Sequence, residues 1–518
     1  MNPLLLVDSY KIHHTNMYPD GITKLYSNFT PRKSRIKGIN NVIVFGIQHF
    51  ILEYIIKKFN KSFFFTQIRN GENRDSKLKE FVISEYKRHC PVDTKHIEAL
   101  WDLGYLPIEI KALDEGNICP IGVPMLTITN THPDFGWLVN YLETLISCML
   151  WQPITSATIA YEYRKILNKY ALETTGSTEG VQWQGHDFSM RGMSSVESAI
   201  NSAMGHLLSF TGTDTVPAIY QLESSYNASG LIGASVPATE HSVMCMGTKE
   251  AEIDTFRRLL NQYPTGILSV VSDTWNLWDV LTKYLPELKQ EILTRDGKLV
   301  IRPDSGDPVD IICGAYNTIS SGDEQNLDYN YPKYDIEKDS PVYKGVIELL
   351  WDTFGGTINE QGYKVLDSHI GAIYGDSITT ERAIAICERL KAKGFASTNI
   401  VFGIGSFTYQ YNTRDTFGFA MKATYGEVTR HGVNPATGKE IVVTESREIF
   451  KDPITDDGTK KSKKGLLLVY KDQNELKCVD QQTWNGEHQG LLTTVFKDGK
   501  LVKETTLEEI RERLNNSL

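Results

Sequence analysis

The densest cluster of residues that could do chemistry is HDFSMRGMSS, at residues 186–195. A short strand would be followed by Ser194-x-x-Glu197, a capping box that predicts a helix over 195–209. Phe188 and Arg191 would then lie at the turn between strand and helix. An aromatic face and a guanidinium together suit a flat heteroaromatic ring beside a phosphate group. A core phenylalanine and a surface arginine explain this segment equally well.

Acidic side chains follow two further apparent strand ends, and an acidic residue and a histidine stand at a loop-to-helix transition. Asp214, in TGTDTV, could orient a loop threonine or accept a hydrogen bond from a carboxamide, and it would repel a carboxylate ligand. In SVPATEHS, Glu240 and His241 stand where a loop becomes a helix. A lone histidine is commonly structural, but its neutral ring nitrogen can also act as a nucleophile or proton carrier. Asp273, at the end of a neighbouring strand, could orient the other ring nitrogen.

The segment IRPDSGDP, at residues 301–308, is more specific. Arg302 and Asp304 lie two apart on a strand and therefore share one face. Arginine binds phosphate with two parallel hydrogen bonds, whereas aspartate suits a pair of ribose hydroxyls. YGDSIT (374–379) and FGIGSF (402–407) are typical of phosphate loops before helices, although Gly-x-Gly-Ser is weak evidence alone. No Gly-x-x-x-x-Gly-Lys-Ser/Thr motif is present, which disfavours P-loop chemistry.

The elements that must position these residues repeat a strand-loop-helix unit from about residue 181. Apolar runs end in polar residues, and Asp273 and Asp304 are separated by the length of one such unit. Polar residues at the carboxyl ends of buried parallel strands follow the logic of an α/β barrel. A doubly wound open sheet would give a similar sequence pattern, but of the two folds the barrel is favoured.

The flanking regions have a different pattern. Residues 1–180 mix helices with short strands, residues 181–415 form the predicted α/β barrel, and residues 416–518 contain strands and turns, including a hairpin over 493–504. We expect both flanks to form a second, α+β domain. Residues 316–345 and 430–440 read as surface insertions, the latter as a hairpin or loop.

Composition excludes several classes of protein. The 518 residues carry a formal charge of −10, so nucleic acid is not an expected partner. Seven scattered cysteines form no Cys-x-x-Cys pair and predict neither a disulfide framework nor a zinc ribbon. We also expect no signal peptide and no membrane span, which together with the cysteine usage suggests a cytoplasmic protein.

The ordered motifs resemble the nicotinamide phosphoribosyltransferase family over nearly the whole chain. They are DSYK (8–11), HDFSMRGMSS (186–195), GTDTV (212–216), SVPATEHS (235–242), VVSD (270–273), IRPDSGDP (301–308), GDS (375–377), FGIGS (402–406), TRD (413–415), FKDP (450–453) and SKKG (462–465). The resemblance implies a type II phosphoribosyltransferase fold, with an irregular α/β barrel and active sites at the interface of a homodimer. The loop Gly403-Ile404-Gly405-Ser406 departs from the family's longer glycine run, which puts its backbone path in question.

The resemblance also assigns roles to residues of this chain. Phe188 would stack on nicotinamide, Tyr10 of the partner subunit would cover the opposite face, and Asp214 would accept from the carboxamide. His241 resembles the family's phosphorylatable histidine, supported by Glu240 and Asp273. The remaining implied contacts are to ribose and phosphates: Arg191, Arg302, Asp304, Gly375, Asp376, Gly405 and Ser406 for the sugar phosphate, and Arg414, Arg32, Lys422 and Lys451 for pyrophosphate or ATP.

The implied reaction joins nicotinamide to phosphoribosyl pyrophosphate, with ATP as co-substrate. Mg²⁺ would be held mainly by the pyrophosphate and not by direct protein ligands. Two alternatives stay open. Nicotinate phosphoribosyltransferase shares fold and chemistry, and Asp214 argues against it because of repulsion with the nicotinate carboxylate. A non-catalytic binding protein on the same scaffold would need neither a phosphate loop nor a phosphorylatable histidine.

Overall fold

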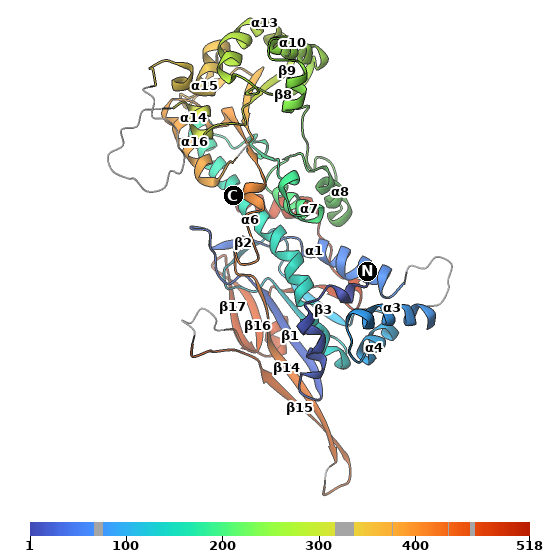
Figure 1. Cartoon of the computed structure of the whole chain (residues 1–518). Coiled ribbons are helices and arrows are strands. Elements are labelled where there is room, and N and C mark those ends of the chain that lie inside the picture. The colour runs from blue at the N-terminus through green and yellow to red at the C-terminus, as the bar shows by residue number, and fades with distance from the viewer. Residues whose placement is uncertain (67–75, 316–335, 376, 434, 456–461) are drawn as a thin grey trace. The chain divides into compact units, whose positions relative to one another are not determined.

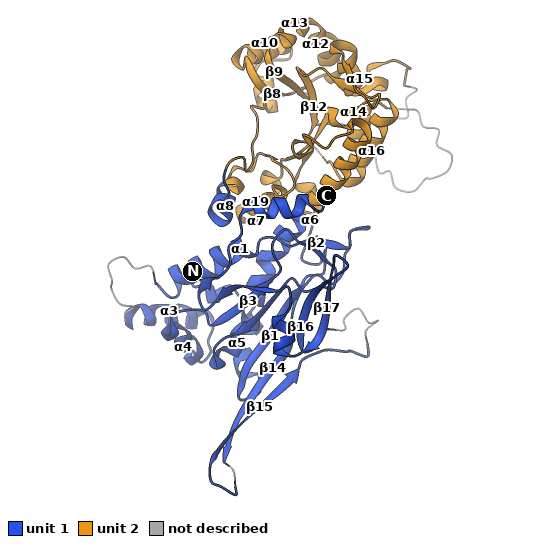
Figure 2. Ribbon diagram, turned by 180° about the vertical axis from the view of Figure 1, so that it is seen from behind, with its two compact units in different colours: residues 1–158, 220–229, 412–518 blue, residues 159–219, 230–411 orange. Residues whose placement is uncertain are grey.

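The structure is a computed structural model that describes residues 1–66, 76–315, 336–375, 377–433, 435–455 and 462–518. The chain forms two compact units (Figure 2). Unit 1 contains residues 1–158, 220–229 and 412–518, and unit 2 contains residues 159–219 and 230–411. The first boundary falls within helix α6 (Glu143–Thr175), so residues 159–180 belong to the barrel unit.

Unit 2 is built on a parallel sheet of six strands (Figure 1). Its strands alternate with helices along the chain. Neighbours in the sheet are successive strands of this sheet, except that the first strand, β6, pairs with the last, β13. The strands are β6 (Gly185–Asp187), β7 (Gly212–Thr213), β8 (Thr265–Val271), β9 (Asp296–Arg302), β12 (Ile370–Tyr374) and β13 (Ile400–Ile404). The main helices are α7 (Val196–His206), α9 (His241–Met246), α10 (Glu252–Gln262), α14 (Pro308–Cys313), α15 (Pro341–Phe354), α16 (Thr380–Ala392) and α17 (Ser406–Tyr409).

Residues 234–239 join the two edges of this sheet. Ala234 forms a parallel bridge with Gly212, and Ala238 forms one with Ser269 of β8. The sheet therefore curls into an irregular barrel, as the alternation of buried strands and helices predicts. The carboxyl ends of all its strands meet at one rim, where the loops that follow them can build a site.

Unit 1 contains a largely antiparallel sheet in the order β15-β14-β1-β5-β3-β18-β19. These strands are β15 (Glu440–Glu448), β14 (Ala420–Val433), β1 (Ile22–Thr30), β5 (Leu126–Asn130), β3 (Ile108–Ala112), β18 (Thr493–Lys497) and β19 (Lys500–Leu501). Segments from both ends of the chain thus share one sheet and one core. The predicted hairpin over 493–504 is confirmed by the pairing of β18 with β19. The predicted irregular barrel with a second α+β domain is confirmed as the fold class.

The insertion at 430–440 forms the end of a long hairpin. Strands β14 and β15 pair from Tyr425–Glu448 to Val433–Glu440 and extend beyond the rest of their sheet (Figure 1). Residues 316–335 of the other predicted insertion lie outside the described residues.

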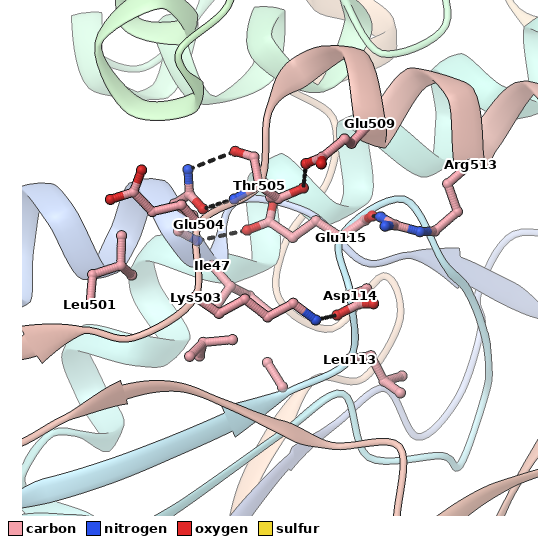
Figure 3. Close-up of a pocket in the computed structure, with 13 residues that line it drawn as sticks. Ile47, Leu113, Asp114, Glu115, Leu501, Lys503, Glu504, Thr505, Glu509 and Arg513 are labelled. Carbon is pink, nitrogen blue, oxygen red and sulfur yellow. Dashed lines mark hydrogen bonds and ion pairs between the residues drawn. The ribbon is translucent and has the colours of Figure 1, made fainter.

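The C-terminal helix α19 (Leu507–Asn515) is joined to Glu115 of the same unit through a backbone carbonyl, and the Glu115 side chain is itself buried (Figure 3). Glu115 accepts hydrogen bonds from the backbone N–H groups of Gly46 and Gln48, at 2.8 and 2.7 Å, and from the Tyr226 hydroxyl. The guanidinium of Arg513, on α19, donates to the Glu115 carbonyl. Beside these groups lies a cavity of about 120 Å³. Burial raises the pKa of Glu115 to about 7, although the three donors oppose that shift.

Candidate active site

The Phe188 ring lies at the barrel rim, directly after β6. Its centroid is 6.0 Å from Arg302 Cζ and 4.6 Å from the His186 ring centroid. Gly403, on neighbouring β13, lets the ring approach the backbone, because a Cβ added there would lie 2.6 Å from Phe188 Cδ2. A glycine at 403 is therefore required by close packing and leaves a flat aromatic surface at the rim.

Asp214 follows β7 and presents a partly exposed carboxylate. Its Oδ1 accepts hydrogen bonds from His186 Nε2 at 2.9 Å and from the Ser235 hydroxyl. Burial raises the pKa of Asp214, but these hydrogen bonds and the charge of Arg302 outweigh burial and leave the pKa below its ordinary value. The carboxylate is therefore ionised at neutral pH, and the described residues give Oδ2 no hydrogen-bond donor. That oxygen is available to a ligand.

Arg302 and Asp304 stand at the end of β9. Arg302 Nη2 donates to the Thr239 carbonyl at 2.8 Å, while its buried Nε has no hydrogen-bond partner among the described residues and lies 3.9 Å from Asp304 Oδ1. A Cβ added to Gly375 would lie 2.8 Å from that same Asp304 oxygen. The guanidinium keeps unused donors, and an anionic ligand can satisfy them.

His241 begins helix α9 and is half exposed. Its Nδ1 is 3.2 Å from the Thr274 hydroxyl, and its Nε2 is 3.9 Å from Asp304 Oδ2. Glu240 precedes it, and its carboxylate accepts from the Ser242 hydroxyl. Nδ1 is thus oriented by the Thr274 hydroxyl, while Nε2 faces the Asp304 carboxylate at a distance longer than a hydrogen bond.

Asp273 does not make the expected contact with His241. Its Oδ2 accepts from the backbone N–H of Asp304 at 2.8 Å and from the Ser305 hydroxyl. The Asp273 carboxylate, at the end of β8, therefore faces the loop after β9 and fixes Asp304. Asp273 supports His241 through Asp304, which faces the His241 ring. The hydroxyl of Thr274, one residue further on, makes the contact expected of Asp273.

The two expected phosphate loops also reach this rim. Gly375 follows β12, whereas Asp376 lies outside the described residues. Gly405 precedes the short helix α17, and a Cβ added to Gly192 would lie 2.0 Å from Ser406 Oγ. The turn that carries the exposed Arg191 therefore packs against the Ser406 loop.

The helix after Arg191 begins one residue later than the predicted capping box. Ser195, and not Ser194, is the N-cap of α7, and its side chain accepts from the backbone N–H of Ser198 at 3.0 Å. The Ser194 N–H instead donates to Gln410 Oε1 at 2.8 Å.

Unit 1 brings together three of the cations expected to contact pyrophosphate or ATP. Arg32, Lys422 and Lys451 line a cavity of about 310 Å³, and Lys463 joins them. Burial lowers the pKa of Lys422, and the neighbouring cations lower it further, although Glu143 opposes them. Like charges gathered in a cavity favour a polyanionic ligand.

The other two expected contacts of unit 1 lie outside that cavity. Arg414 is exposed and pairs with Asp415 at 3.6 Å. Tyr10 is 60% exposed and contacts the ring of His14 edge-on. Lys11 Nζ lies over the Tyr10 ring, 5.3 Å from its centroid. Both side chains are accessible to a ligand or another subunit.

Four contributing residues lie within or directly beside the sequence motifs, but none of them was assigned a role from the sequence. His186 and Ser235 hold Asp214, Thr274 contacts His241, and Lys463 lines the cationic cavity. Their positions in the motifs HDFSMRGMSS, SVPATEHS and SKKG were the signal for His186, Ser235 and Lys463. No group of three or more His, Cys, Asp or Glu residues in the described ranges is arranged to hold a metal ion.

The barrel and its rim define the type II phosphoribosyltransferase class. Two solved structures cover nearly the whole chain at 14% identity, which shows the fold. Nicotinate-nucleotide pyrophosphorylase from Pyrococcus furiosus has a TM-score of 0.54, with 99% of this chain and 94% of that one covered. Human nicotinic acid phosphoribosyltransferase has a TM-score of 0.52, with 98% and 93% covered.

Sequence comparison narrows the class to one family. Residues 183–500 match the nicotinate phosphoribosyltransferase family, and residues 2–93 match the N-terminal domain of nicotinamide phosphoribosyltransferase. The chain is 49% identical to a nicotinamide phosphoribosyltransferase of Acinetobacter baylyi, with 100% of this chain and 98% of that protein covered. A Mycoplasma pneumoniae protein of the same name is 37% identical, with 85% and 94% covered. The chain therefore belongs to the nicotinamide phosphoribosyltransferase family and is a pentosyltransferase.

Proposed function

We propose that the enzyme makes nicotinamide mononucleotide and pyrophosphate from nicotinamide and phosphoribosyl pyrophosphate, as a step of NAD salvage. The convergence of Phe188, Asp214 and Arg302 at one barrel rim carries this proposal. Phe188 offers a face for the pyridine ring, and Asp214 Oδ2 accepts a hydrogen bond from the carboxamide. Arg302 and Asp304 bind the sugar phosphate beside that ring.

The pyridine nitrogen attacks C1 of the ribose as pyrophosphate leaves. No general base is needed, because the nitrogen lone pair is already free. Positive charge develops on the sugar, so the chain contributes mainly positioning and electrostatic stabilisation. The carboxylate of Asp304 lies where it can bind ribose hydroxyls and oppose that charge.

The cationic cavity of unit 1 supports binding of the pyrophosphate. Arg32, Lys422, Lys451 and Lys463 supply donors without acceptors, which suits phosphate oxygens. Mg²⁺ would enter on the pyrophosphate oxygens and neutralise part of their charge. In this proposal the enzyme is a cytoplasmic homodimer, and Tyr10 of one subunit covers the nicotinamide bound in the other. None of the described helices is long and apolar enough to cross a membrane.

ATP hydrolysis would be coupled to synthesis through His241. The ring nitrogen Nε2 attacks the γ-phosphorus of ATP, a nitrogen–phosphorus bond forms, and ADP leaves. Water later cleaves that bond and releases phosphate. The half-exposed ring and the Thr274 contact at Nδ1 support this role, because they orient Nε2 toward the rim.

Product detection tests the proposal. The purified full-length enzyme is incubated with nicotinamide, phosphoribosyl pyrophosphate and Mg²⁺, with and without ATP. We expect nicotinamide mononucleotide in both reactions and a larger yield with ATP. Absence of this product under both conditions would overturn the proposed activity and restore the non-catalytic alternative.

A further inference from the structure

Asp187 is a fully buried carboxylate directly beneath the rim. Its Oδ1 accepts hydrogen bonds from the Ser189 backbone N–H at 3.0 Å and from the Ser189 hydroxyl at 2.6 Å. Its Oδ2 accepts from the hydroxyls of Thr213 at 2.8 Å and Thr215 at 2.7 Å. Both oxygens of the carboxylate are therefore occupied by donors from its own unit.

These donors belong to two different loops of the candidate site. Ser189 follows Phe188 after β6, whereas Thr213 and Thr215 flank Asp214 after β7. The Asp187 carbonyl also accepts from the Asp214 backbone N–H at 3.0 Å. One carboxylate thus connects the backbone on both sides of Asp214 to the backbone beside Phe188.

His206 contacts strand β7, which carries Thr213. This fully buried ring lies between the Gly212 carbonyl, 3.0 Å from Nε2, and the Tyr409 hydroxyl, 2.7 Å from Nδ1. Burial lowers the pKa of His206 to about 4, so the ring is neutral at neutral pH and does not neutralise Asp187. The Asp187 side chain is therefore held mainly by its hydrogen bonds to Ser189, Thr213 and Thr215.

Burying a carboxyl group is an inefficient way to stabilise a protein core, because its desolvation is costly. Hydrogen bonds to a charged group are directional, however, and each contributes more than a neutral one. Their geometry favours a role in fixing the two loops relative to each other.

We propose that Asp187 is a positioning residue that sets the separation of Phe188 and Asp214, and through it the preference for nicotinamide over nicotinate. The inference rests on the proposed function. The two carboxylate oxygens of Asp187 act separately. Oδ1, which accepts from Ser189, holds the loop that carries Phe188, and Oδ2, which accepts from Thr213 and Thr215, holds Asp214.

Thr215→Val tests the threonine side, because it removes one donor to Asp187 and keeps the side-chain shape. Thr211→Val is the matched control, since the Thr211 hydroxyl donates to the Gln182 carbonyl outside this network. We expect Thr215→Val to raise the KM for nicotinamide about tenfold and to reduce the preference for nicotinamide over nicotinate. The KM for phosphoribosyl pyrophosphate should match that of the control.

Ser189→Ala tests the other side and serves if Thr215→Val does not fold. Phe188 would stack on either pyridine, so we expect the KM values for nicotinamide and nicotinate to rise together with their ratio unchanged. If the folded variants show the substrate preference and KM values of Thr211→Val, Asp187 has only a structural role and the inference fails. If the unaltered enzyme makes no nicotinamide mononucleotide, the proposed function fails with it.

Discussion

In the proposed function, Asp214 sets the substrate preference through one carboxylate oxygen. His186 and Ser235 occupy Oδ1, and the negative charge at Oδ2 attracts a carboxamide N–H and repels a carboxylate. We expect Asp214→Asn to lower kcat/KM for nicotinamide by about 10- to 100-fold, the value of a hydrogen bond to a charged group. The loss for nicotinate should be smaller, because the repulsion is removed.

Steady-state kinetics with both pyridines measure this effect. Asp307→Asn is a suitable control, because Asp307 caps helix α14 by accepting from two backbone N–H groups, and asparagine can do the same. Equal losses for both substrates in Asp214→Asn would contradict the assigned role.

His241 offers a separate prediction. We expect His241→Ala to abolish ATP hydrolysis while retaining basal synthesis, because the proposed phosphoryl acceptor is lost and the Phe188 surface is not. Phosphate release and nucleotide formation are measured in parallel. His431→Ala, a histidine paired with Glu440 on the exposed β14–β15 hairpin, is the control. Parallel loss of synthesis and hydrolysis would refute the coupling role.

Residue types at strand ends were predictable, but their individual contacts were not. Parallel strands end at one rim, so Phe188, Asp214, His241 and Arg302 could be grouped from the sequence. The choice of Thr274 over Asp273 as the partner of His241 depends on the direction of two adjacent side chains after β8. Strand periodicity does not specify that direction beyond the last paired residue.

At the scale of elements, Glu115 links the packing of residues 46–48 against Tyr226 to pH, because its carboxylate accepts hydrogen bonds from donors of Gly46, Gln48 and Tyr226. Its pKa in the folded protein is about 7, above the ordinary value of 4.5. A raised carboxyl pKa stabilises the fold fully below the ordinary value, and this contribution disappears as pH rises through the folded value. We therefore expect the melting temperature to fall relative to that of Glu115→Gln between pH 4.5 and about 7. The shift corresponds to about 3 kcal/mol.

Calorimetry of both proteins across this pH range measures the difference. Glu504→Gln is the control, because Glu504 lines the same cavity but is exposed (Figure 3). A constant difference in melting temperature between the unaltered protein and Glu115→Gln across the range would contradict the prediction.

Elements with a long apolar run were the most predictable. The strands β8, β9, β12 and β13 coincide largely with apolar runs that end in polar residues, because burial on both faces selects unbroken apolar sequence. Residues 234–239 join the barrel edges through single bridges, and so short an extended segment has no distinctive pattern. The capping shift from Ser194 to Ser195 has a similar cause, since adjacent serines are equivalent in sequence.

At the scale of the whole molecule, the sequence predicts that the N- and C-terminal flanking regions form one domain. It does not predict where the N-terminal region ends and the barrel begins. Strand β14 lies beside β1 in one sheet, so segments separated by almost 400 residues share a core. The boundary within α6 could not be located from sequence, because one helix crosses it from Glu143 to Thr175, and the internal Pro153 does not coincide with the boundary after residue 158.

The proposed homodimer predicts complementation between two inactive variants. Tyr10→Ala and Phe188→Ala should each be inactive, but a mixed dimer would have one complete site if Tyr10 acts in the partner's site. Random assortment of equal amounts should restore about a quarter of the unaltered rate. The two variants are co-expressed with different tags and assayed after tandem purification as well as in the mixture. No recovery in the purified mixed dimer would contradict a shared site.

Competition between the two pyridines tests the central claim most directly. Equal concentrations of nicotinamide and nicotinate are supplied to the unaltered enzyme with phosphoribosyl pyrophosphate, Mg²⁺ and ATP, and both mononucleotides are quantified. We expect nicotinamide mononucleotide to dominate, because ionised Asp214 accepts from an amide and repels an acid. A majority of nicotinate mononucleotide would contradict the placement of Asp214 against the substrate's carboxamide.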